Sequence, residues 1–61
     1  MFNLGHLVVF KTGKNSFIYI IDEIKSNMLV LRNIISSAKL DATLDQIREA
    51  EDIEILLGRR T

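Results

Sequence analysis

The chain has 61 residues, no cysteine, and eight basic against eight acidic residues, which gives a formal net charge of zero. A chain this short has room for one domain and buries only about 60% of the surface that its unfolded form exposes. The lack of cysteine excludes disulfides and thiolate metal sites, the usual supports of very small domains. With 48% hydrophobic residues, the composition favours a tightly packed barrel that associates with a second copy or another protein.

The charges are unevenly divided along the chain. Residues 1–40 carry five basic and two acidic residues, a net charge of +3, whereas residues 41–61 carry three basic and six acidic residues, a net charge of −3. This dipolar arrangement is weaker evidence for nucleic-acid binding than an overall basic domain would be.

Three short apolar runs, separated by polar turn residues, predict three antiparallel strands in the first half of the chain. We expect them over residues 5–11, 16–23 and 28–34. The first connection, at residues 12–15, is predicted to be a tight turn because Gly13 and Asn15 tolerate positive φ. The apolar runs do not alternate with polar residues, so apolar side chains are expected on both faces of the sheet.

Two interpretations of residues 43–50 remain open. Thr43 and Gln46 have the spacing of a capping box, which permits a helix that continues to Leu57. The alternation of Leu40, Ala42 and Leu44 instead predicts a fourth strand over residues 39–44. A brief turn would then lead to a fifth strand over residues 48–50 and a helix over residues 51–58.

The final helix is predicted to stop at Gly58, a residue favoured just beyond a helix end. Within it, Ile53, Leu56 and Leu57 fall on one side at helical spacing, and Ile55 lies nearly opposite. A short helix with two apolar faces cannot bury both against one sheet. We therefore expect Ile53, Leu56 and Leu57 to form a protein interface.

The last third of the chain carries the pattern Ile47-Arg48-x-Ala50, Glu54-Ile55, Gly58-x-Arg60. This pattern resembles the closing segment of small, mostly uncharacterised SH3-like barrel proteins of phages and prophages. The resemblance implies a mainly β fold, a small five-stranded SH3-like barrel with a short C-terminal α-helix that spans residues 1–61 as one domain. The chain departs from those proteins at Glu51-Asp52, where they often have Thr-Pro, and at Ile53, where they often have an acid. They share no activity that the resemblance would transfer.

The sequence offers no convergent set of catalytic or metal-ligating groups. His6 is the only histidine, and a metal site needs several ligands. Asp22 and Glu23 are neighbours on a predicted strand, so they point to opposite faces and suit paired acid–base catalysis poorly. We predict a protein that is not an enzyme and uses no cofactor or metal. The acidic residues of the second half are expected to solvate the surface: Asp41, Asp45, Glu49, Glu51, Asp52 and Glu54.

The leading hypothesis is a protein-binding module, a homodimer, whose contacts come from the apolar helix side and an uncovered sheet face. The resemblance to phage and prophage proteins implies an accessory role, such as inhibition of a host factor. The alternative is a nucleic-acid-binding barrel in which Phe17 or Tyr19 stacks a base and five basic residues contact phosphates. These are Lys11, Lys14, Lys25, Arg32 and Lys39.

The expected location is the cytoplasm, that of the bacterial host if the gene belongs to a phage. Residues 1–14 lack the basic start and long apolar core of a signal peptide. The longest apolar run spans five residues, against the roughly 20 that a membrane helix needs. No membrane partner is therefore expected.

Overall fold

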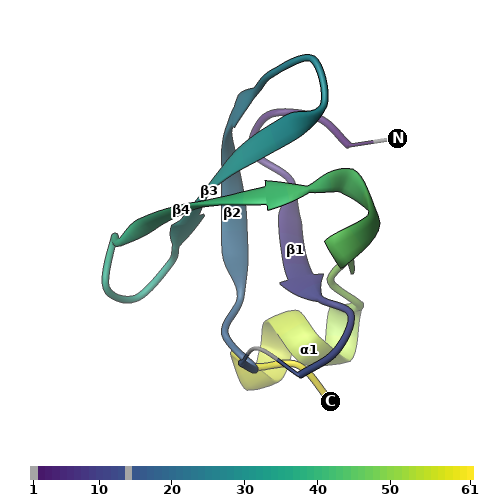
Figure 1. Cartoon of the computed structure of the whole chain (residues 1–61). Helices are drawn as coiled ribbons and strands as arrows, with labels where there is room; N and C mark the ends of the chain where they lie inside the picture. The colour runs from purple at the N-terminus through teal and green to yellow at the C-terminus, as the bar shows by residue number, and fades with distance from the viewer. Residues whose placement is uncertain (1, 14) are drawn as a thin grey trace.

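The computed structural model, which describes residues 2–13 and 15–61, contains a five-stranded antiparallel sheet followed by a short helix (Figure 1). The strands lie in the order β4-β3-β2-β1-β5. Their bounds are Leu7–Phe10 (β1), Tyr19–Ile24 (β2), Met28–Asn33 (β3), Lys39–Thr43 (β4) and Ile47–Glu49 (β5). A 3-10 turn, η1, spans Leu44–Gln46, and the helix α1 spans Asp52–Leu57.

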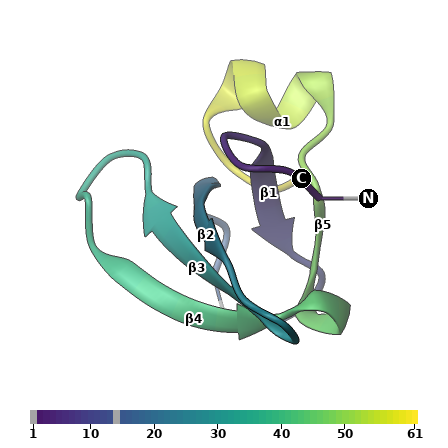
Figure 2. The same ribbon diagram turned by 90° about the horizontal axis from the view of Figure 1, so that it is seen from above.

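The sheet curves around one interior, and η1 joins its two edge strands (Figure 2). Among the described residues β4 and β5 do not pair, so the ring of hydrogen bonds is open at this point. The fold class predicted from the sequence is confirmed: a mainly β, small SH3-like barrel with a short C-terminal helix.

The second strand begins at Tyr19, three residues later than predicted. The carbonyl group of Ser16 accepts a hydrogen bond from the Arg60 N–H at 2.7 Å, and that of Ile18 accepts one from the Ile34 N–H at 3.3 Å. These partners lie outside the β1–β2 ladder and draw residues 16–18 away from it. The predicted tight turn is therefore a longer connection.

The two interpretations of residues 43–50 are resolved in favour of strands. The capping-box contact is present, because the Thr43 N–H donates to Gln46 Oε1 at 2.9 Å. It closes only the three-residue turn η1, since Ile47 is extended, 1% exposed and paired with Phe10 of β1. Burial of Ile47 in the sheet thus prevents a long helix.

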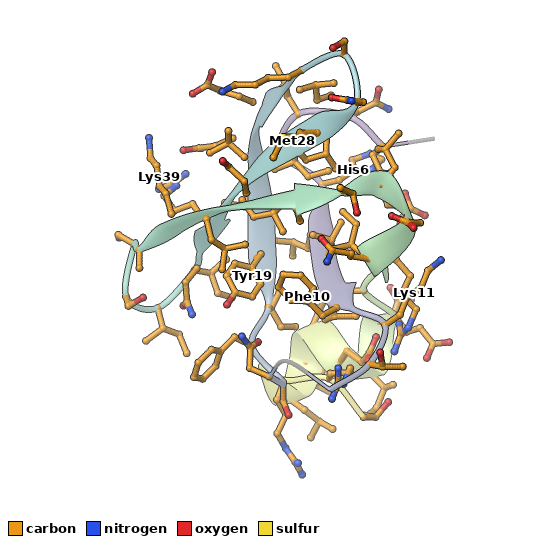
Figure 3. All side chains as sticks on the ribbon, in the orientation of Figure 1. His6, Phe10, Lys11, Tyr19, Met28 and Lys39 are labelled. Atoms are coloured by element: carbon orange, nitrogen blue, oxygen red, sulfur yellow. The ribbon has the colours of Figure 1, made fainter. Side chains whose placement is uncertain are left out.

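The core fills the inside of the barrel with alternate residues of the strands. Val8 and Phe10 point inward from β1, and the rings of Phe10 and Tyr19 meet edge to face with centroids 5.5 Å apart (Figure 3). Such aromatic pairs add to the stability that comes from burial alone. The complete cluster is Val8, Phe10, Tyr19, Ile21, Leu29, Leu31, Ala42 and Ile47.

The sequence predicts an uncovered apolar face on the sheet, but the outer face of β3 is not an exposed apolar surface. Val30 points outward there, but its partners in the neighbouring strands are Glu23 and Asp41, and it is only 8% exposed. On β1, the outward Val9 is completely buried beside its register partner Arg48. The sheet therefore contributes no open apolar face at these positions.

Truncating a core side chain tests this packing. We expect Leu31→Ala to lower the free energy of unfolding by about 3 kcal/mol, because Leu31 is fully buried and its loss leaves a cavity. The matched control is Ile35→Ala in the β3–β4 turn, where the side chain is 76% exposed and the change should stay within about 0.5 kcal/mol. Urea denaturation at one protein concentration measures the free energy of unfolding of both variants. An equal decrease in the two variants would contradict the assignment of Leu31 to the core.

Candidate functional site

The helix α1 is attached to the barrel through a buried carboxylate. Glu54 is 0% exposed. Its two oxygens accept hydrogen bonds from Nη1 and Nη2 of Arg48, both at 2.7 Å. They also accept bonds from the backbone N–H groups of Glu51 at 2.8 Å and Thr61 at 3.0 Å. Four donors thus hold one charged group between β5, the start of α1 and the end of the chain.

These contacts keep Glu54 ionised. The hydrogen bonds from Arg48 are the main cause that lowers the pKa of Glu54 from 4.5 to about 2, against the opposing effect of burial. The backbone donors on Glu51 and Thr61 lower it further, and the same pairing raises the pKa of Arg48. For Glu54, the expectation that the acidic segment only solvates the surface is wrong, because this side chain is completely enclosed.

The polarity of α1 is the reverse of that in an ordinary surface helix. Its one buried residue is Glu54, whereas Leu56 is 81% exposed, Ile53 50%, Leu57 49% and Ile55 44%. Gly58 ends the helix in the left-handed region, at φ 76°, and its N–H donates to the Glu54 carbonyl oxygen at 2.8 Å. The three predicted interface residues are therefore all exposed on one helix. We call Ile53, Leu56 and Leu57 the α1 surface.

A cavity of about 490 Å³ opens at the other end of the barrel. The N-terminal segment and the β2–β3 turn lie at the top of Figure 1, and α1 lies at the bottom. We call this the barrel-end cavity, and its lining residues are Phe2, Asn3, Ile24, Lys25, Ser26, Leu29 and Leu44. The sequence predicted no cavity here, and the available signal was that Phe2 and Ile24 lie outside the three apolar runs.

The basic residues proposed for nucleic-acid contact are not gathered on one surface. Arg32 and Lys39 are register partners, and each lies 3.3 Å from a carboxylate oxygen of Asp22, which offsets their charge. Lys11 lies on the opposite side of the barrel from Lys39 (Figure 3). The other two are Lys25, which lines the barrel-end cavity, and Lys14, which is outside the described residues.

The two aromatic residues considered for base stacking have different environments. Tyr19 is 3% exposed, and its hydroxyl oxygen accepts a hydrogen bond from Asn15 Nδ2 at 3.0 Å. It belongs to the core and cannot stack a base. Phe17 is 50% exposed, so it is the one of the pair that remains accessible.

The histidine forms a single ion pair and no larger cluster among the described residues. His6 Nδ1 lies 3.0 Å from Glu49 Oε1 at the edge formed by β1 and β5. Within residues 2–13 and 15–61, no group of three or more His, Cys, Asp or Glu side chains is placed to hold a metal ion. No helix in the same ranges is long and apolar enough to cross a membrane.

Comparisons of the chain with protein-family models, curated proteins and solved structures gave no match. The candidate site is therefore defined by its own geometry: a rigidly held apolar helix surface at one end of the barrel and an apolar cavity with one lysine at the other.

The buried carboxylate predicts a specific pH dependence of stability. Folding lowers the pKa of Glu54, so its contribution is complete above the unfolded value of 4.5 and is lost as the pH falls toward about 2. We expect the free energy of unfolding to drop across this interval. Glu54→Gln should lower the free energy of unfolding at pH 7 by about 3 kcal/mol, because Arg48 loses its charged partner. The decrease of the free energy of unfolding at acidic pH should also become shallower in this variant.

Chemical denaturation at a series of pH values measures this effect. Glu23→Gln is the matched control, since Glu23 is an exposed carboxylate on β2 with no ion pair among the described residues. It should retain the pH profile of the unmodified protein. If Glu54→Gln left the acid-side profile unchanged, the role assigned to Glu54 would be wrong.

Proposed function

We propose that this protein is a small non-catalytic binding module that acts through protein contacts made by the α1 surface. The observation that supports this proposal is the reversed polarity of α1, which buries Glu54 and exposes Leu56, Ile53 and Leu57. Aliphatic side chains grouped on a surface mark sites of protein contact more often than isolated ones do.

The α1 surface is well suited to binding because it is already ordered. The hydrogen bonds of Arg48, Glu51 and Thr61 to Glu54 hold the helix in place. A preorganised surface loses less conformational entropy on association than a flexible one. Binding would therefore retain most of the free energy gained by removing these side chains from water.

The proposed assembly includes a homodimer or another homo-oligomer, and a partner protein of a phage or its host. Self-association is supported by apolar exposure beyond the α1 surface, at Leu4. An accessory role, such as inhibition of a host factor, is supported by the resemblance to phage and prophage barrel proteins. Glu51 and Asp52 beside the α1 surface would favour encounter with a basic partner.

Charged substitutions on α1 test the proposal. We expect the unmodified protein to self-associate in sedimentation velocity measurements across a dilution series, and Leu56→Glu and Ile53→Glu to shift it to monomer, because a charge would be buried without a partner. Ile35→Glu is the control, since it introduces the same charge at an exposed isoleucine far along the chain. A chain that is monomeric at high concentration, or association that survives both α1 substitutions, would contradict the proposal.

A second candidate function is nucleic-acid binding, which the adjacency of Arg32 and Lys39 on the outer face of the sheet favours. Asp22 weakens this candidate because it pairs with both cations. Phosphate binding would depend steeply on salt, since each contact releases condensed counterions.

Salt-dependent retention on duplex and single-stranded DNA and on RNA distinguishes the two candidates. If nucleic acid is bound, replacing Arg32 and Lys39 together by alanine should reduce the salt slope by about 2. Arg59→Ala, which removes an exposed cation outside the proposed contacts, should change it less. No retention at low salt would eliminate nucleic-acid binding.

A further inference from the structure

We infer that the α1 surface of one copy docks into the barrel-end cavity of a second copy, so that the chains associate head to tail. This inference rests on the proposed function and names the partner of the α1 surface as this same chain. Three features of the molecule support it: the apolar character of both surfaces, their opposite charges, and their positions at opposite ends of the barrel.

The two surfaces are both apolar. The cavity has a volume of about 490 Å³ and an apolar lining that includes Phe2, Ile24 and Leu44, with the buried Leu29 beneath. Cavities of roughly 300–1,000 Å³ are large enough to enclose a compact apolar group. On α1, Leu56 is the most exposed large hydrophobic side chain among the described residues. It is the natural group to enter the cavity.

The charges beside the two surfaces are opposite and available. Lys25 lines the cavity, and Asp52 is the first residue of α1; neither forms an ion pair among residues 2–13 and 15–61. Head-to-tail docking brings Asp52 of one copy to Lys25 of the next, an arrangement that steers association.

The positions of the surfaces determine the kind of contact. The molecule measures 31 Å along its longest axis, and both views place α1 far from the β2–β3 turn (Figures 1 and 2). A chain cannot fill its own cavity with α1, and a contact between two different surfaces is heterologous. A symmetric α1-to-α1 contact would leave the cavity and Lys25 unused, whereas head-to-tail docking occupies both surfaces.

Mixing two variants tests the inference. Leu56→Glu blocks the α1 surface, and Ile24→Glu, at a side chain that is 49% exposed, blocks the cavity. We expect each variant alone to associate at least tenfold more weakly than the unmodified protein. An equimolar mixture should form a 1:1 heterodimer that grows no further, because one intact α1 surface meets one intact cavity. Leu44→Glu, also 49% exposed, provides a second cavity variant if Ile24→Glu does not fold.

Exchanging the charges of Lys25 and Asp52 tests the inference independently. Lys25→Glu and Asp52→Lys should each weaken association at low salt, and the chain that carries both changes should recover it. Thermal unfolding checks that each variant is folded. Recovery in the double variant would support the pairing of Lys25 with Asp52 across the contact, and additive weakening would overturn it.

The outcomes separate this inference from the proposed function. If Ile24→Glu and Leu44→Glu associate like the unmodified protein while Leu56→Glu is monomeric, α1 binds a surface other than the cavity. The head-to-tail inference would then fail and the binding role of α1 would stand. If the unmodified protein is monomeric at every concentration, both fail.

Discussion

The fold depends on one buried ion pair at the junction of β5 and α1. Removing a carboxylate from water is costly unless its oxygens find compensating donors. The Glu54 carboxylate has four, from the Arg48 guanidinium and the N–H groups of Glu51 and Thr61. These donors belong to three residues in different parts of the second half of the chain. The carboxylate therefore fixes the last strand, the start of the helix and the end of the chain relative to one another, a task that apolar packing performs in larger domains.

This arrangement attaches α1 to the barrel through a buried polar group and leaves its aliphatic side chains largely exposed. A helix of six residues is far below the roughly 12–15 at which isolated helices become marginally stable, so α1 exists because of its tertiary contacts. They include the hydrogen bonds that Glu54 accepts from Arg48, and those that Arg60, just beyond the helix, donates to the carbonyl oxygens of Ser16 and Phe10. Leu56 is 81% exposed, and Ile53 and Leu57 are about half exposed. The fold thus leaves much of the aliphatic surface of α1 in contact with solvent.

Local patterns predicted most of the fold, whereas contacts between distant residues escaped prediction. The strands at Met28–Asn33 and Lys39–Thr43 and the helix at Asp52–Leu57 follow from short-range periodicity and turn residues. Sequence alone could not separate Glu54 from the exposed acids around it, because only the fold brings Arg48 and Thr61 to it. The barrel-end cavity was also hidden, since its lining comes from residues 2 to 44 of the chain. The α1 surface was predictable because its residues are close in sequence.

The pattern that resembles phage and prophage barrel proteins describes how a helix is attached to a barrel. Arg48 and Glu54 form the buried pair, Ala50 donates its N–H to the Leu7 carbonyl oxygen at 2.9 Å, and Gly58 supplies the left-handed cap. In this chain every one of these roles is structural. Ile53 stands where those proteins often have an acid, and it is half exposed. The proposed binding surface therefore includes a position at which this chain departs from the pattern that it resembles, and it lies outside the buried Arg48–Glu54 pair.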